Sequence, residues 1–328
     1  MQNSIVITVG DMNGIGPELI LKCLSATDQS DTRFILVGPV SVFRFYANLL
    51  KNPFEIAVVH STDAIPKSEN VIFDPFVSEY IPNPGKISTI AGEIAMKSLD
   101  LGISLVINEF AQAIVTAPIS KESIQMAGFD YAGHTEFLAE NTSCAEYTMM
   151  LISGGLRVGL VTTHIPVRQI ADAITQDAIV SKAKIIHNTL KTQFSIKKPK
   201  IAILALNPHA GDGGVIGTEE IEVIEPAMMT LNQMGIECDG PFPTDGFFGS
   251  HKFEDFDAIL AMYHDQGLGP FKTLSFGRGV NFTAGLPIIR TSPDHGTAFA
   301  IAGKNSASID SMLEAINLAK KLTLKLST

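Results

Sequence analysis

The chain has 328 residues, of which 45% are hydrophobic and 18% charged, as in an ordinary globular protein with room for two α/β domains. Its formal net charge of −10 argues against nucleic-acid binding, because phosphate backbones are held by basic surfaces. The three cysteines stand far apart, which argues against a disulfide scaffold or a thiolate zinc cluster.

The chain opens with a β-branched run, Ser4 to Val9, that predicts a strand and does not resemble a secretory signal peptide. A glycine-containing turn follows and leads into a predicted helix, where Pro17 suits the first position. The turn lacks the GxGxxG spacing of a dinucleotide fingerprint, although such a turn can present N–H groups to an anion. No apolar run approaches the roughly 18 residues of a membrane span, so we expect a cytoplasmic protein.

Strand and helix patterns alternate in the first third of the chain. Apolar runs at Phe34–Val37, Glu55–Val59 and Ala113–Thr116 predict strands. Residues 88–108 carry apolar side chains at helical spacing, and a helix start is expected near Ser88. Residues 63–87 are rich in Pro, Ser and Asn, and we expect surface connections there.

His134 and Thr135 stand just before another helical pattern. The N–H groups at a helix start, together with a hydroxyl, favour an anion. A plain helix N-cap is the alternative role for Thr135.

Three further strand-like runs each lead to a histidine. Arg157–Thr163 is followed by His164, Lys200–Leu206 leads to His209, and Ala258–Met262 leads to His264. In a parallel α/β sheet, ligands bind beyond the carboxyl ends of the strands. Three imidazoles delivered to one edge suggest a metal site, and three unrelated loop histidines are the alternative.

The segment 257–297 is rich in glycine and carries several cations and other polar side chains, namely Lys272, Arg278, Asn281, Arg290, Asp294 and His295. Such a loop-rich segment suits the binding of a small anionic molecule better than a core. No motif surrounds the remaining histidines His60, His187 and His251, and we expect them on the surface. The alternation of strands and helices along the chain predicts an α/β fold with mainly parallel pairing.

Eight ordered motifs make the chain resemble the 4-hydroxythreonine-4-phosphate dehydrogenase (PdxA) family of vitamin B6 biosynthesis. They are GDMNGIGPE, VTAPISK, GHTEFLAE, VTTHIPVRQI, NPHAGDGG with IGTEE, AMYHDQG, FGRGVNFTAGLP and IRTSPDHGTAFAIAGK. Met12-Asn13 and Gly269-Pro270-Phe271 depart from the family pattern, next to expected site residues. Both ends of the chain also resemble the wider isocitrate/isopropylmalate dehydrogenase superfamily, which binds NAD without GxGxxG.

The resemblance implies two α/β/α sandwich domains with a cleft between them, and a homodimer with the active site at the subunit interface. We expect residues 1–125 and 271–328 to form a discontinuous, cofactor-side domain. Residues 126–270 are then expected to form the second domain, with the three metal-ligand strands and the dimer contact.

The resemblance also implies roles for individual residues. His164, His209 and His264 are expected to hold one divalent ion (zinc, magnesium, manganese or cobalt). The expected substrate-binding residues are His134, Thr135, Lys272, Asn281 and Arg290, and NAD or NADP is expected at the loop of His295, Gly296 and Thr297.

The implied reaction oxidises 4-phosphooxy-L-threonine with a nicotinamide cofactor. The product is a β-keto acid that decarboxylates to 3-amino-2-oxopropyl phosphate. Asp245, Asp265 and His134 are candidates for the general base, and Asp265 is equally placed to orient an imidazole.

Other functions are compatible with the same motifs. A sister dehydrogenase acting on a four-carbon sugar-acid 4-phosphate would keep nearly all of them. A metal-dependent lyase or hydrolase would also use three histidines. The NAD-like loop at His295 counts against it.

Overall fold

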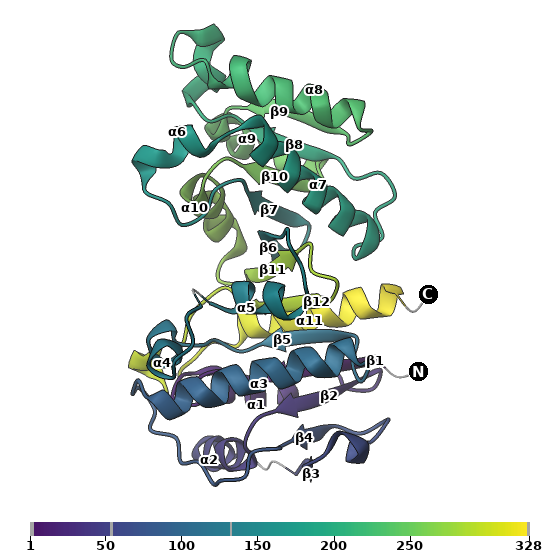
Figure 1. Ribbon diagram of the computed structural model, residues 1–328, viewed down its shortest axis with the longest axis vertical. Helices are drawn as coiled ribbons and strands as arrows, with labels where there is room; N and C mark the ends of the chain where they lie inside the picture. The colour runs from purple at the N-terminus through teal and green to yellow at the C-terminus, as the bar shows by residue number, and fades with distance from the viewer. Residues whose placement is uncertain (1–2, 53–54, 132, 327–328) are drawn as a thin grey trace. The chain divides into compact units, whose positions relative to one another are not determined.

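The computed structural model describes residues 3–52, 55–131 and 133–326, and the chain divides into two compact units. The first unit comprises Met1–Ala145 and Leu286–Thr328, and the second comprises Glu146–Gly285. The first is therefore built from both ends of the chain, shown in purple to blue and in yellow in Figure 1.

The unit boundaries differ from those expected from the sequence. Residues 126–145 belong to the first unit, because helix α5 (His134–Asn141) packs against α3 (Thr89–Ile107). Residues 271–285 belong to the second, because strand β11 (Val280–Ala284) pairs with β6 there.

The first unit contains a parallel sheet with the strand order β3-β4-β2-β1-β5-β12. In that order, the strands are Ala57–Val59, Val71–Phe73, Thr32–Val37, Asn3–Thr8, Ala113–Thr116 and Ile289–Pro293. The helices besides α3 and α5 are α1 (Gly16–Ala26), α2 (Val40–Leu50), α4 (Lys121–Met126) and α11 (Asp310–Leu326). Strands β1, β2, β5 and β12 are buried along their whole length, as expected for a parallel sheet covered on both faces.

Helix starts in this unit follow the sequence signals. Pro17 lies in the first turn of α1. Helix α3 begins after Ser88, whose hydroxyl accepts a hydrogen bond from the N–H of Ala91 at 3.2 Å. These two predictions are confirmed.

One segment of this unit was predicted wrongly. Residues 63–87 were expected to be surface connections, but Val71–Phe73 form the buried strand β4, between β2 and β3. Three residues are too few to show strand alternation in a sequence, so the pattern did not reveal it.

The second unit has a mixed sheet with the strand order β11-β6-β7-β10-β8-β9. Strands β7, β10, β8 and β9 run parallel, whereas β6 is antiparallel to both β7 and β11. The bounds are Thr148–Ser153 (β6), Leu156–Leu160 (β7), Ala258–Ala261 (β10), Ile201–Leu204 (β8) and Cys238–Phe242 (β9). The helices are α6 (Ile170–Ala173), α7 (Gln176–Thr192), α8 (Glu225–Gln233, preceded by a π-turn at Glu220–Ile224), α9 (Thr244–Gly249) and α10 (His264–Ser275).

The segment that the sequence indicated to be rich in loops contains regular structure on both sides of the unit boundary. Lys272 lies on α10, and Asn281 and Arg290 lie on strands β11 and β12. The glycines of this segment hid the strand pattern. Short 3₁₀ turns lie at Thr62–Ala64, Val167–Gln169, Lys252–Asp255 and Phe299–Ile301, and Pro208–Gly214 form a turn with left-handed backbone angles.

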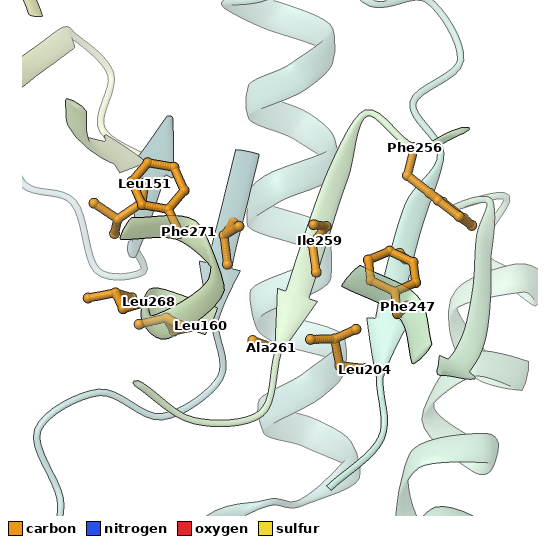
Figure 2. Packing of buried hydrophobic residues seen from close by; sticks show 11 residues of the cluster. Leu151, Leu160, Leu204, Phe247, Phe256, Ile259, Ala261, Leu268 and Phe271 are labelled. Atoms are coloured by element: carbon orange, nitrogen blue, oxygen red, sulfur yellow. The ribbon is translucent and has the colours of Figure 1, made fainter. Parts of the chain in front are cut away.

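A core of apolar side chains holds α10 and α9 on one face of the second sheet (Figure 2). Leu160 and Ile259 from neighbouring strands belong to the same cluster as Leu268 and Phe271 of α10. Each fully buried side chain of this kind contributes about 1.5–3 kcal/mol of hydrophobic free energy. The cluster thereby fixes α10, which begins at His264, against the sheet.

His187 corrects another expectation. It was expected on the surface, but it lies on the buried side of α7, where burial, and to a smaller extent Lys191, lowers its pKa.

Within the described ranges, no helix is long and apolar enough to cross a membrane.

Candidate active site

The three histidines that follow strands lie beyond adjacent strands of the second unit. Strand β10 is paired in parallel with β7 on one side and with β8 on the other. His164, His264 and His209 follow β7, β10 and β8, respectively. We call this carboxyl edge, with its three histidines, the histidine edge.

Hydrogen bonds beyond the strand ends bring His164 and His264 together. The N–H of Val161 donates to the carbonyl of Ala261 at 2.9 Å. Thr162 donates to the carbonyl of Met262 from its N–H at 3.1 Å and from its hydroxyl at 2.8 Å. The two imidazole rings lie with their centroids 5.7 Å apart. They therefore approach each other because the backbone pairing of β7 and β10 continues past both strands.

Asp265 holds the His264 ring. Its Oδ1 lies 2.7 Å from Nδ1 of His264, while the Asp265 side chain is 89% exposed. A neutral imidazole that donates from Nδ1 keeps its lone pair on Nε2, the arrangement found in metal-ligating histidines. Of the two roles considered for Asp265, the geometry favours orientation of the ring.

Gln266 is a site residue that the sequence reading missed. Its buried side chain accepts a hydrogen bond from the N–H of Met262 at 2.6 Å. It also donates to the carbonyl of Ala205 at 2.5 Å and to the hydroxyl of Thr244 at 2.9 Å. It thus joins the ends of β10 and β8 to the start of α9. Little in the sequence pointed to it, because Gln266 stands among other polar residues, His264 and Asp265, at the start of α10.

Gln266 bonds Thr244, the neighbour of Asp245 at the start of α9. Asp245 is exposed in the first turn of α9, next to Thr244. It is thus carried by an element tied to the strand ends.

His209 lies in a left-handed turn. Six consecutive residues, His209 to Gly214, have positive φ, beginning with φ 53° and ψ 27° at His209. This conformation costs roughly 1–2 kcal/mol for each residue that has a Cβ. The His209 side chain is exposed. In the described part of the chain, no three His, Cys, Asp or Glu side chains are grouped so that they could hold a metal ion. The structure therefore brings two of the three predicted ligands together, and the metal site stays a prediction.

A buried cation lies in the first unit. Arg290, on β12, is 1% exposed. It donates to the hydroxyl of Thr116, at the end of β5, from Nη2 at 2.8 Å and from Nε at 3.2 Å. Burial lowers the pKa of Arg290 to about 10, and the nearby Glu136 carboxylate opposes that shift. The guanidinium therefore stays charged at neutral pH.

His134 lies near this cation, at the start of α5. Its Nε2 is 3.1 Å from the carbonyl of Ala117, the residue after β5. Burial in the first place, and then the positive charge of Arg290, lower the pKa of His134 to about 3, against the opposing effect of the Ala117 bond. His134 is therefore a neutral imidazole that donates from Nε2 and carries its lone pair on Nδ1.

Thr135 lies in the first turn of α5 but is not the helix N-cap, which is Gly133. The predicted substrate residues His134, Thr135 and Arg290 thus all lie in the first unit, Arg290 as the second residue of β12 and the other two at the start of α5. We call Arg290, Thr116 and His134 the buried arginine group.

The two other predicted substrate residues, Lys272 and Asn281, belong to the second unit. Lys272 is exposed in the last turn of α10. Asn281 lies on β11 opposite Leu151 of β6. Their role in substrate binding stays a prediction.

The turn after β1 uses its N–H groups within the protein. The bonds run from Asp11 to the Pro118 carbonyl (2.9 Å), from Asn13 to the Asp11 carboxylate (2.9 Å), from Gly14 to the Asp11 carbonyl (3.0 Å) and from Ile15 to the Thr297 carbonyl (3.0 Å). Burial raises the pKa of Asp11, while bonds led by that from Ser123 act in the opposite direction. These N–H groups are therefore not open to an anion, contrary to the possibility that the sequence raised.

The loop predicted to bind the cofactor is attached to this turn through Thr297. His295 lies in the same loop, with Nδ1 3.0 Å from the carbonyl of Gly296. Its Nε2 is buried and has no hydrogen-bond partner among the described residues. A buried polar atom in this state favours a ligand partner.

Comparisons with known proteins give one result along nearly the whole chain. Residues 30–319 match the family model described as pyridoxal phosphate biosynthetic protein PdxA. A protein of Bacteroides thetaiotaomicron named 4-hydroxythreonine-4-phosphate dehydrogenase is 44% identical over 96% of this chain and 87% of its own. A protein of the same name from a Sulfurihydrogenibium species is 41% identical over 96% of this chain and 97% of its own.

A solved structure agrees with these relatives. The crystal structure of a 4-hydroxythreonine-4-phosphate dehydrogenase from Klebsiella pneumoniae has a TM-score of 0.89 and 36% sequence identity. The match covers 98% of each chain. It confirms the α/β fold expected from the sequence.

Proposed function

This chain belongs to the PdxA family of pyridoxal phosphate biosynthetic proteins, and on that premise we propose that it catalyses the 4-hydroxythreonine-4-phosphate dehydrogenase reaction. In that reaction, C3 of 4-phosphooxy-L-threonine gives up a hydride and its 3-hydroxyl loses a proton; a bound nicotinamide cofactor would supply the two-electron oxidant. The product, 2-amino-3-oxo-4-phosphooxybutanoate, is a β-keto acid. It loses carbon dioxide and yields 3-amino-2-oxopropyl phosphate.

The observation that carries the proposal is the extent of the relationship. Relatives that bear this name match 96% of the chain at 41–44% identity, so the match includes all the predicted site segments. The geometry of the histidine edge and of the buried arginine group supports the same function.

His164, His209 and His264 are proposed to hold one divalent ion (zinc, magnesium, manganese or cobalt). The donors fit such an ion, because Asp265 binds Nδ1 of His264 and leaves Nε2 for a ligand bond. When bound, the ion would supply Lewis acidity toward the substrate hydroxyl.

Arg290 is proposed to bind an anionic group of the substrate, its phosphate or its carboxylate. Its position is set before substrate arrives, because the guanidinium is buried and bonded to Thr116. A planar guanidinium gives a two-pronged contact with either anion. His134 has its lone pair on Nδ1 and would accept a hydrogen bond from a substrate hydroxyl or ammonium group.

Asp245 is the proposed proton acceptor. His134 is a poor base, since its pKa is about 3. Asp265 is bonded to His264. Asp245 is exposed at the start of α9, which Gln266 ties to the histidine edge. Asp245 is therefore the best of the three candidates for the proton acceptor.

The loop of His295, Gly296 and Thr297 is proposed to bind NAD or NADP. The buried Nε2 of His295 supports a polar contact with the cofactor. We also propose that the protein acts as a homodimer, as the resemblance to its family implies. Sedimentation equilibrium of the full chain tests that state.

The central experiment measures formation of reduced nicotinamide from two substrates, 4-phosphooxy-L-threonine and a four-carbon sugar-acid 4-phosphate. Each is tested with NAD and NADP, and with added zinc, magnesium, manganese or cobalt. Turnover of 4-phosphooxy-L-threonine, with release of carbon dioxide, supports the proposal. Turnover of the sugar-acid phosphate alone would instead indicate a sister dehydrogenase.

A further inference from the structure

The turn of residues 209–213 needs an external support, because it reverses the usual handedness of the backbone. Asp212 has φ 46° and ψ 53°, and Ala210 has φ 52° and ψ 43°. Residues with a Cβ rarely adopt such angles, and successive ones are rarer still. A segment of this kind persists only where the surrounding structure determines it.

Glu220 supplies the support directly ahead of the turn. The side chain is 1% exposed, and its Oε1 accepts hydrogen bonds from the N–H groups of Leu206 at 2.8 Å and Asn207 at 2.7 Å. Its Oε2 accepts another from Nδ2 of Asn207 at 2.9 Å. Both oxygens therefore hold the two residues that precede Pro208 and His209.

The turn also packs closely against this carboxylate. Gly211 has φ 76°, and a Cβ placed there would lie 2.7 Å from Oε2 of Glu220. The N–H of Ile216 closes the turn by donating to the carbonyl of Gly211 at 3.0 Å. Glu220 thus meets the turn at its entry and in its middle. It does so from the first residue of a π-turn, a form often found at functional sites.

We infer that Glu220 is a positioning residue that fixes the left-handed turn and thereby orients His209 for metal binding. The inference rests on the proposed role of His209 as a metal ligand. Glu220 binds the backbone N–H groups of Leu206 and Asn207 and the side-chain amide of Asn207, so it acts through the chain ahead of His209 rather than on the substrate.

The test compares Glu220→Gln with Glu222→Gln in the full chain. Both remove one negative charge from the same π-turn, but the Glu222 side chain is exposed. Loss of an outer partner of a metal ligand weakens metal affinity by roughly 10–100-fold. We expect Glu220→Gln to raise the Kd for Co²⁺, measured by titration calorimetry, at least about tenfold, while Glu222→Gln leaves it unchanged.

Amide hydrogen exchange gives a second readout that does not depend on metal. In metal-free protein, the amides of Leu206 and Asn207 should exchange faster in Glu220→Gln and remain as in the native chain in Glu222→Gln. Unchanged exchange at these amides in Glu220→Gln would overturn the inference. If His209→Ala weakens Co²⁺ binding but Glu220→Gln leaves the Kd for Co²⁺ unchanged, the inference is overturned as well.

The same two readouts separate this inference from the proposed function. If His209→Ala leaves Co²⁺ binding intact, the proposed metal role of His209 fails. Faster exchange in Glu220→Gln would then show that Glu220 holds the turn without serving metal binding, and this result would overturn the inference. If Glu220→Gln does not fold, Asn207→Ala removes the side-chain bonds to Oε2 of Glu220 and to Oε2 of Glu219, and keeps the backbone bond to Oε1 of Glu220. It should show a smaller change in the same direction, and no change in either readout would overturn the inference.

Discussion

The buried arginine group and the histidine edge obtain their geometry in different ways. Arg290 is 1% exposed within the sheet of the first unit and is fixed by Thr116 on the neighbouring strand. At the histidine edge of the second unit, His164 is exposed and the His264 side chain is 36% exposed.

The difference shows what fixes the side-chain positions in each group. Folding alone sets the position of Arg290, because burial and strand pairing leave its side chain no other position. The histidines are carried by loops beyond the strand ends and are held by a few hydrogen bonds. We therefore expect the first group to respond mainly to substitution and pH, and the second to the supply of metal.

Chelation should have the largest effect. Exposed imidazoles exchange a bound ion with solvent, so exhaustive treatment with EDTA should reduce turnover to below about one hundredth, and a divalent metal should restore it. Turnover is measured as formation of reduced nicotinamide. Full activity in protein shown to be free of metal would contradict the metal assignment.

Two histidine variants test whether the metal is bound at the histidine edge. His264→Ala should impair metal binding strongly. His251→Ala serves as its control, because His251 is exposed in the same unit and has no place at the histidine edge.

Arg290→Lys should reduce kcat/KM by about 100-fold, mainly through KM, although the positive charge is kept. An ammonium group cannot reproduce both the bonds to Thr116 and a two-pronged contact with an anion. Steady-state kinetics measure this change. Arg278→Lys is the matched control, since Arg278 is exposed. An unchanged KM would place Arg290 outside the substrate site.

His134 should make stability depend on pH. Its pKa is lowered from 6.5 to about 3 in the folded protein, so the unfolded chain binds the proton more readily. Stability is therefore lost as the pH falls from about 6.5 toward about 3, and no loss from this group occurs above that window. Between about pH 7.5 and pH 5, His134 should remove about 2 kcal/mol from the free energy of unfolding.

Urea unfolding at both pH values measures this effect. The difference should shrink in His134→Asn and persist in His251→Asn, whose side chain is exposed. An equal pH dependence in native protein and His134→Asn would show that His134 is not held neutral.

Asp265→Asn should have the smallest effect, a loss of about tenfold in metal affinity. The amide keeps the size of the side chain but binds Nδ1 of His264 more weakly than the carboxylate. Titration with Co²⁺ measures the affinity. Asp255→Asn, an exposed position in the same unit, should leave it unchanged. An unchanged Kd in Asp265→Asn would show that His264 does not need this partner.

The sequence predicted the strands that dominate both units, because runs such as Ser4–Val9 and Ala258–Met262 are mostly apolar and thus mark buried parallel strands. It missed β4, which has only three residues. Glycine and polar residues around β11 and β12 also hid the strands that carry Asn281 and Arg290.

For the candidate site, the position of each histidine after a strand was visible in the sequence, and so was the cluster of cations. The sequence could not show which polar residues are buried. Gln266 and Glu220 are such residues, and each is defined by bonds to backbone groups far from it in the chain. Such partners depend on tertiary packing, which periodicity does not encode.

The split of the first unit over both ends of the chain has a consequence for its synthesis on the ribosome. Residues 146–285 form one continuous unit, which can fold as soon as it has emerged. Strand β5 gains its neighbour β12 only after that, because β12 begins at Ile289. Throughout translation of the second unit, β5 is thus an open strand edge, and such edges invite aggregation. Nascent chains halted before Ile289 should therefore depend most on chaperones that shield unpaired strands.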